Sequence, residues 1–120
     1  MLVERMERWG AQAWLVNTGW TGGPYGTGSR MKLSHTRAMV RAALAGELDK
    51  ATYTRDPVFG FEVPATVPGV PTEVLTPRST WSDTAAYDAQ AKKLAGMFRD
   101  NFEQFRSEVP DAVVRAGPAT

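Results

Sequence analysis

The chain has 120 residues, of which 42% are hydrophobic and 22% charged, a balance that predicts one globular folding unit. Its formal net charge of +1 gives no electrostatic reason to expect nucleic acid or a membrane surface as a partner. The sequence contains no cysteine and no apolar run long enough to span a bilayer, which argues against a disulfide framework, a thiolate metal site and a membrane span and favours a cytoplasmic chain.

The first residues predict a helix followed by a strand. Apolar residues recur at helical spacing over 2–9, and Gly10 is suited to end this helix in a left-handed conformation. We expect the helix to pack against the rest of the chain, with Trp9 and Trp14 in the core rather than serving as a stacking platform for a base. The apolar run 14–16 predicts a buried strand of an α/β sheet.

A glycine-rich loop follows this strand. Five of the eleven glycines lie between Gly19 and Gly28, and this density lets another group approach the backbone amides closely. Arg30, Lys32 and a helix start come next, which suits an anionic, phosphate-bearing ligand. The string GPYGTGS is similar to a phosphate loop, but the lysine and the magnesium-binding hydroxyl that should follow it are absent. The residues alone leave open whether these glycines bind a ligand or only form the turns of a strand-to-helix loop.

The next helix is expected to run from Ser34, as its cap, to about Leu48. Thr36 falls in the first turn, where its hydroxyl and the unpaired amides face the loop, or where the hydroxyl bonds the local backbone instead. His35 is the single histidine and has no other ligand at metal-binding spacing, so we assign it to the helix start and not to catalysis. The expected apolar face comprises Met39, Val40, Ala43, Leu44 and Leu48.

Five of the eight prolines lie in residues 51–81, which excludes long helices there. Alternating residues predict short strands at 51–54 and 59–63, joined by extended connections across the surface. Phe59 and Phe61 point to the same side of an extended chain, so we expect them to anchor this region to the core.

The longest helix is expected within residues 82–107, with Ser82 as its cap and Asp83 in its first turn. Burying its three phenylalanines and one leucine would contribute on the order of 6 to 12 kcal/mol before entropy. The helix should therefore dock on something large, or else bind a partner chain. A short turn and a tail are expected over 108–120. The apolar stripe comprises Tyr87, Ala91, Leu94, Phe98, Phe102 and Phe105.

Three strings, VNTGWTGGPYGTGSRMKLSHTRA, DPVFGFEVP and PGVPTEVLTPRSTW, resemble the carboxy-terminal part of ATP-dependent phosphoenolpyruvate carboxykinases, and the resemblance extends over nearly the whole chain. It implies an α/β fold, with a mixed sheet and packing helices, in which residues 1–120 form a single C-terminal segment of the nucleotide-binding domain. Met1 would then be an internal start or the result of a truncated reading frame. The implied subdivision is 1–50 (helix, strand, glycine-rich loop, helix), 51–81 (proline-rich connection), 82–107 (long helix) and 108–120 (tail).

The resemblance also assigns nucleotide contacts. The family's glycine-rich loop and following helix contribute to the adenine and ribose side of the ATP site, which carries over to Arg30, Met31 and Thr36. A guanidinium at Arg30 would stack on or hydrogen bond to the purine, and Met31 would form an apolar wall beside it. A surface salt bridge and an ordinary core contact are the alternatives for these two residues. Arg78 matches a family string, and we expect its role to be structural.

The implied function is that of part of an enzyme that converts oxaloacetate and ATP to phosphoenolpyruvate, carbon dioxide and ADP in gluconeogenesis. No catalytic residue and no metal ligand is expected in this segment, because the phosphate loop, the ligands of Mg and Mn and the oxaloacetate-binding residues would lie upstream in the same enzyme. The segment alone is predicted to be inactive. The alternative is a truncated, catalytically silent module that binds a nucleotide or a partner chain.

Overall fold

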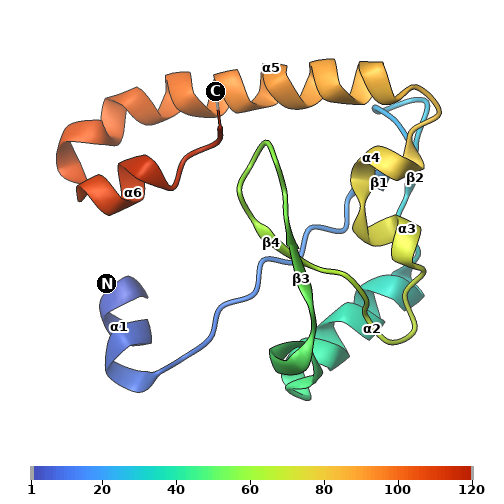
Figure 1. The fold of residues 1–120 in the computed structure, drawn as a ribbon, viewed down its shortest axis with the longest axis horizontal. Helices are drawn as coiled ribbons and strands as arrows, with labels where there is room; N and C mark the ends of the chain where they lie inside the picture. Colours follow the sequence, from blue (N-terminus) through green and yellow to red (C-terminus); the bar gives the residue numbers. More distant parts are fainter. Residues whose placement is uncertain (1, 120) are drawn as a thin grey trace.

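The computed structural model describes residues 2–119, which form short helices and two β-hairpins with one long helix, α5, along the top of the view in Figure 1. The radius of gyration is 16.0 Å, compared with about 13.6 Å for a compact chain of this length. The elements are α1 (Leu2–Trp9), β1 (Trp20–Thr21), β2 (Ser29–Arg30), α2 (Leu33–Leu44), η1 (Glu47–Lys50), β3 (Tyr53–Arg55), β4 (Glu62–Pro64), α3 (Thr72–Leu75), α4 (Pro77–Thr80), α5 (Thr84–Phe102), η2 (Glu103–Glu108) and α6 (Asp111–Arg115).

The strands form two separate antiparallel hairpins. β1 pairs with β2, and β3 pairs with β4 with Thr54 opposite Val63. The described residues therefore combine helices and strands, as expected, but the strands do not join into a mixed sheet. The predicted strand 14–16 is wrong in this structure: residues 11–18 have no regular secondary structure and are largely exposed. None of the described strands pairs with residues 14–16. An extended segment without a neighbouring strand forms no backbone hydrogen-bond ladder and is therefore not a β-strand.

The hydrophobic core is small and lies between α2, η1 and the segment before α3. Ala42, Leu48, Val67 and Val70 are buried there, and Val67 and Val70 also form an isolated bridge. Part of the predicted face of α2 is confirmed, since Met39 and Ala43 pack against this cluster. Leu44 is instead exposed, because the helix ends at that residue and η1 turns Leu48 inward.

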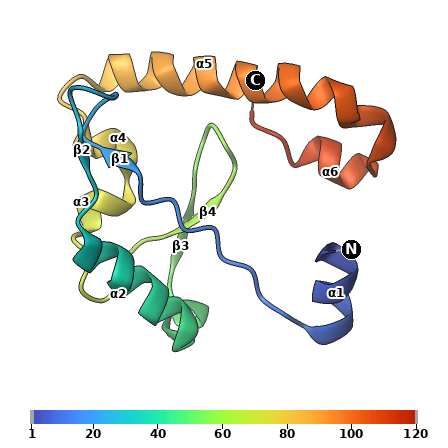
Figure 2. The same cartoon turned by 180° about the vertical axis from the view of Figure 1, so that it is seen from behind.

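The predicted helix α1 is confirmed over 2–9, with Gly10 at φ 61° after its last residue. The expected packing of this helix against the rest of the chain is not observed. Trp9 is 73% exposed, and its ring contacts the guanidinium of Arg8 instead of core residues. Figure 2 shows the reason, because α1 stands apart at the end of an extended segment. The expectation that Trp9 and Trp14 lie in the core is therefore wrong for this chain, although Trp14 stacks on Tyr53 with 6.3 Å between ring centroids.

Both predicted serine caps are displaced by one or two residues. Lys32 occupies the cap position of α2, without a side-chain cap bond, so Ser34 lies inside the first turn. Asp83 caps α5, its carboxylate accepting a hydrogen bond from the amide of Ala86 at 3.0 Å, so Ser82 lies outside the helix. A carboxylate also complements the positive helix end, which favours aspartate over the adjacent serine.

The proline-rich region contains both predicted strands, which begin two and three residues later than expected and end one residue later, and it contains no long helix. The four-residue helices α3 and α4 were not predicted there. Phe59 and Phe61 stack at 6.3 Å as neighbours on one side, but Phe59 meets Phe98 of α5 edge to face instead of the core cluster. Phe98 remains 53% exposed, so the apolar stripe of α5 is only partly covered.

Candidate functional site

The glycine-rich loop is the turn of the β1–β2 hairpin. Trp20 lies opposite Arg30 in the ladder, and the amide of Met31 extends the pairing by donating to the carbonyl of Gly19 at 3.0 Å. Within the turn, the amides of Thr27 and Gly28 both donate to the carbonyl of Pro24, at 3.0 and 2.9 Å. The loop that composition marks as flexible is thus closed by its own backbone hydrogen bonds.

Gly28 fixes how tightly this turn closes. A Cβ atom at this position would lie 2.6 Å from the carbonyl oxygens of both Gly23 and Thr21. These neighbours are backbone atoms, which cannot rotate away as the end of a side chain can. The two sides of the hairpin can therefore approach this closely only with glycine at 28, and this is a close-approach role of the kind that composition predicts for the loop.

The hairpin is held against α4 by the hydroxyl of Thr80. This oxygen accepts a hydrogen bond from the amide of Gly22 at 3.1 Å and lies 3.3 Å from the hydroxyl of Thr21. It donates in turn to the carbonyl of Pro77 at 2.7 Å, within its own helix. Sequence reasoning missed Thr80, because nothing local to PRST indicates contact with a loop almost sixty residues earlier.

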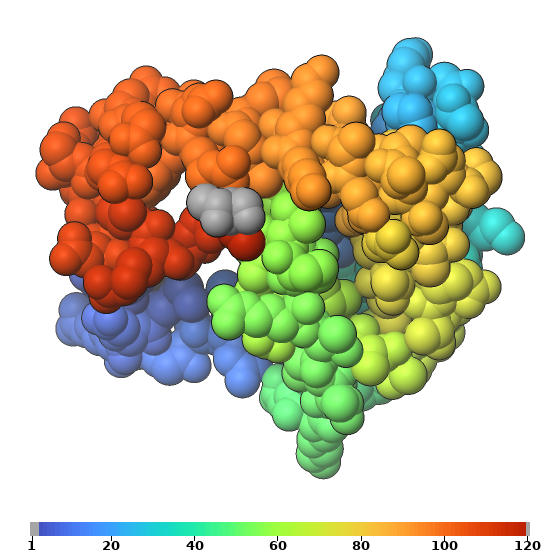
Figure 3. Space-filling model, turned by 45° about the horizontal axis from the view of Figure 1, so that its top comes forward, coloured from blue at the N-terminus to red at the C-terminus, as the bar shows by residue number. Residues whose placement is uncertain are grey.

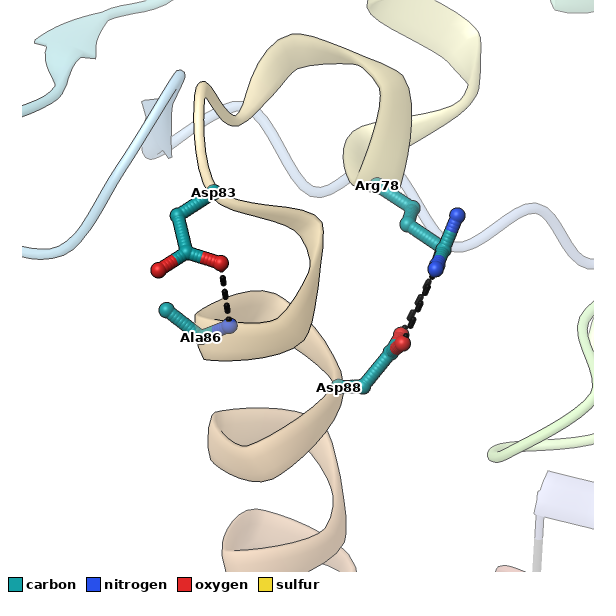
Figure 4. Close-up of polar contacts among 4 residues, drawn as sticks. All are labelled: Arg78, Asp83, Ala86 and Asp88. Carbon is teal, nitrogen blue, oxygen red and sulfur yellow. Dashed lines mark hydrogen bonds and ion pairs between the residues drawn. The ribbon is translucent and has the colours of Figure 1, made fainter.

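The next part of the site is the start of α5. Arg78 of α4 forms a bidentate ion pair with Asp88 of α5, with Nε–Oδ1 at 2.8 Å and Nη2–Oδ2 at 2.9 Å (Figure 4). This hydrogen bonding holds the pKa of the Asp88 carboxyl below its ordinary value. The ion pair links α4 to α5 across what we call the α4–α5 junction, residues 77–88, and the Asp83 cap closes the first turn of α5 within it. Arg78 thus makes a structural contact, as expected from its sequence context.

The three predicted nucleotide contacts lie on one short stretch of chain. Arg30 is the last residue of β2 and is exposed, Met31 is half-buried between β2 and α2, and Thr36 is half-buried in the first turn of α2. Among residues 2–119, the side chain of Arg30 makes no ion pair or hydrogen bond, and the hydroxyl of Thr36 makes no hydrogen bond. The salt bridge and the local hydroxyl bond that were the alternatives for these residues are therefore not formed in this part of the chain.

The amino end of α2 presents fewer free amides than a complete first turn would. The amides of His35 and Thr36 both donate to the carbonyl of Lys32, at 3.0 and 3.3 Å. Among the four residues of this first turn, 33–36, only Leu33 and Ser34 have amides without an acceptor in the described chain. These two amides are the donors that the helix end can offer to an anion. The Thr36 hydroxyl remains available, but its own amide does not.

The hairpin that contains Arg30 also contains two aromatic residues, and sequence reasoning did not assign them to the site. Trp20, opposite Arg30 in the ladder, meets Tyr25 edge to face with 5.1 Å between ring centroids. Tyr25 is 85% exposed, at the tip of the loop. Aromatic residues inside a glycine-rich string were the available signal, since flat rings next to a guanidinium can bind a planar base.

Residues 2–119 contain no group of three or more His, Cys, Asp or Glu side chains arranged to hold a metal ion. Within the same residues, no helix has both the length and the apolarity that a membrane crossing requires.

Comparison with known proteins identifies a family. Residues 1–73 match the phosphoenolpyruvate carboxykinase family. Phosphoenolpyruvate carboxykinase (ATP) 1 of Moorella thermoacetica is 62% identical to the chain over 117 residues. Phosphoenolpyruvate carboxykinase (ATP) of Thermus thermophilus is 55% identical over 120 residues. The enzyme of Paracoccus denitrificans is 57% identical over 113 residues. These matches cover 98%, 100% and 94% of the chain, but 22%, 23% and 21% of the relatives, so the chain spans about a fifth of their length.

Proposed function

Since the chain belongs to the ATP-dependent phosphoenolpyruvate carboxykinase family, we propose that it is a segment of such an enzyme and supplies the adenosine side of its ATP site. The observation that carries the proposal is identity of 52% or more to carboxykinases named for ATP over 94 to 100% of the chain. The segment includes the whole β1–β2 hairpin, in which Trp20 lies opposite Arg30.

The residues of the hairpin have distinct roles in this proposal. The unpaired guanidinium of Arg30, which lies opposite Trp20 in the ladder, stacks on or hydrogen bonds to the purine. Met31 forms an adaptable apolar wall, and the free hydroxyl of Thr36 hydrogen bonds to the nucleoside. The Gly28 turn and the Thr80 hydroxyl hold the hairpin in place without touching the ligand.

The complete reaction belongs to the longer enzyme. In this proposal, oxaloacetate is decarboxylated and the γ-phosphoryl group of ATP is transferred to the resulting enolate, giving phosphoenolpyruvate, carbon dioxide and ADP in the cytoplasm during gluconeogenesis. This segment holds the adenosine so that the phosphates are aligned for in-line transfer, and that alignment lowers the barrier by orientation. No set of three or more His, Cys, Asp or Glu side chains in residues 2–119 is arranged to hold Mg or Mn, and this proposal places the ligands of both ions in the rest of the longer enzyme.

The test uses a chimera, the Moorella thermoacetica relative with its matching segment replaced by this chain. We expect Arg30→Ala to raise the KM for ATP on the order of tenfold, equivalent to about 1.4 kcal/mol, with little change for oxaloacetate. Arg41→Ala is the matched control, because Arg41 is an exposed cation in the last turn of α2, the helix that follows β2. Equal changes in both KM values, or no change, would contradict the assignment of Arg30.

A catalytically silent binding module is the second candidate, and the exposed apolar residues of α5 and 11–18 favour it. The two differ in turnover. The chimera should decarboxylate oxaloacetate in the presence of ATP, and the 120-residue chain alone should not. A chimera that binds ATP without turnover would support the silent module instead.

A further inference from the structure

The segment between α1 and β1 is extended but unpaired. No backbone amide or carbonyl of residues 12–18 is hydrogen bonded to another described residue. Hydrogen bonds occur only at its two ends. The amide of Ala11 donates to the carbonyl of Met6, and the amide of Gly19 donates to the side-chain oxygen of Asn17. Seven consecutive residues with unpaired backbone groups are a free strand edge, which proteins ordinarily pair or cover.

The side chains of this segment are apolar on both sides. Trp14 and Val16 are 38% and 41% exposed, on the side where Trp14 stacks on Tyr53. Leu15 lies between them, so it points the opposite way in an extended chain, and it is 80% exposed. Figure 2 shows the segment crossing the β3–β4 hairpin, which covers one side only. Consecutive apolar residues are typical of strands whose two faces are both covered.

The whole molecule exposes more surface than a finished domain. Its accessible surface is 9301 Å², whereas a folded monomer of 13.1 kDa exposes about 6,400 Å². The excess of roughly 2,900 Å² on this one chain exceeds the area of about 1,000 to 2,500 Å² that each partner buries in a permanent interface. In the space-filling view the chain is open between α6 and the β3–β4 hairpin (Figure 3). A large body of polypeptide is therefore needed to cover it.

We propose that residues 13–17 pair as a strand with the polypeptide that the longer relatives have beyond the matched fifth, and that the same polypeptide covers Leu15. The inference rests on the proposed function, because family membership identifies this occupant: the relatives have some four-fifths of their length outside the match. Strand addition satisfies the backbone through main-chain hydrogen bonds and fixes side chains in alternate pockets. A second copy of this chain would add one more short edge but no layer over Leu15.

The test is amide hydrogen exchange in the chimera and in the 120-residue chain, both without ATP. In the chain alone, amides 13–17 should exchange at rates close to those of unstructured peptide. In the chimera they should slow on the order of 100-fold or more, because paired amides exchange only on opening. The amides of β3 are the internal control, since they are already in a hairpin and should be protected in both proteins.

Two variants test the side-chain part of the proposal. Leu15→Glu in the chimera should restore fast exchange at 13–17, whereas Gln12→Glu adds the same charge just outside the strand and should not. Unchanged exchange at 13–17 between the two proteins overturns the inference, as does protection in the chain alone that rises with its concentration, since the occupant is then a second copy. The Arg30→Ala kinetics are independent of this readout, so failure of the ATP site and failure of the strand pairing are distinguishable.

Discussion

Residues 11–18 and residues 19–31 are consecutive in the chain, and their outcomes are opposite. The first segment has the apolar residues that are typical of a stable strand, yet it is largely exposed and the backbone of its residues 12–18 is unpaired. The second has the glycines that are typical of a flexible loop, yet backbone hydrogen bonds close it and Thr80 holds it. Backbone order thus follows from the number of hydrogen-bond partners within reach and not from apolar character.

The largest expected effect breaks the ordered half of this comparison. Gly28→Ala places a methyl group against two carbonyl oxygens, so the turn must open, at a cost of about 1–3 kcal/mol. We expect faster amide exchange throughout 20–31 and weaker ATP binding by the chimera. Residues 12–18 of the 120-residue chain should not change, because their backbone has no pairing to lose.

The matched control for this change is Gly19→Ala in the same loop. Its Cβ would have one neighbour, the Asn17 side chain at 3.8 Å, which is an ordinary contact. Both variants reduce the flexibility of the backbone, but only Gly28→Ala introduces a steric clash. The difference in amide exchange between them therefore measures the effect of close packing at Gly28. Equal loosening by both would show that the turn is not held by the approach at Gly28.

The sequence predicted those features of the fold that depend on near neighbours. The helix α1 and its Gly10 end, the two short strands of the proline-rich region and the long α5 all follow from patterns a few residues long, whereas the pairing of those strands was not predicted. Cap positions were missed by one or two residues, because Ser82 and Asp83 are both suitable caps and only the backbone geometry selects one. The strand at 14–16 could not be decided locally, since a strand needs a partner that lies elsewhere.

The candidate site divides in the same way. Arg30, Met31 and Thr36 come from a contiguous string, so resemblance could locate them together, and their contact with a nucleotide remains a prediction. Thr80 could not be found, because its role depends on α4 lying beside the hairpin. Trp20 could have been found, since a two-residue strand on either side of a glycine turn places it opposite Arg30.

A smaller effect is expected at the α4–α5 junction, on which the hairpin rests. Asp83→Ala removes the cap bond to the Ala86 amide and should cost about 1 kcal/mol of stability. Ser82→Ala should change stability little, because Ser82 lies before the cap. Thermal unfolding measures both. A larger loss from Ser82→Ala would contradict the observed helix start, and faster exchange of the Gly22 amide in Asp83→Ala would show that the ordered loop depends on the junction.

The smallest effect is expected from the exposed ion pair of the same junction. Arg78 lowers the pKa of Asp88 in the folded chain, so the pair stabilises the fold above the ordinary carboxyl pKa of 3.8, and this contribution is lost as the pH falls through the lowered value. Asp88→Asn removes the titrating group, so the thermal midpoint should depend less on pH in this acidic window. The effect should be smaller than that of the cap, because both side chains are about half exposed and water screens their attraction.

Glu103→Gln is the matched control, since it removes the exposed pair with Arg106 beyond the far end of α5. It should leave amide exchange of the β1–β2 hairpin unchanged, whereas Asp88→Asn should raise that exchange slightly through α4 and Thr80. If both variants altered the hairpin equally, the effect would be one of net charge, and the order of residues 19–31 would not depend on the contact between α4 and α5. A hairpin response confined to Asp88→Asn would instead trace that order to the Arg78 contact, even though the pair contributes little to overall stability.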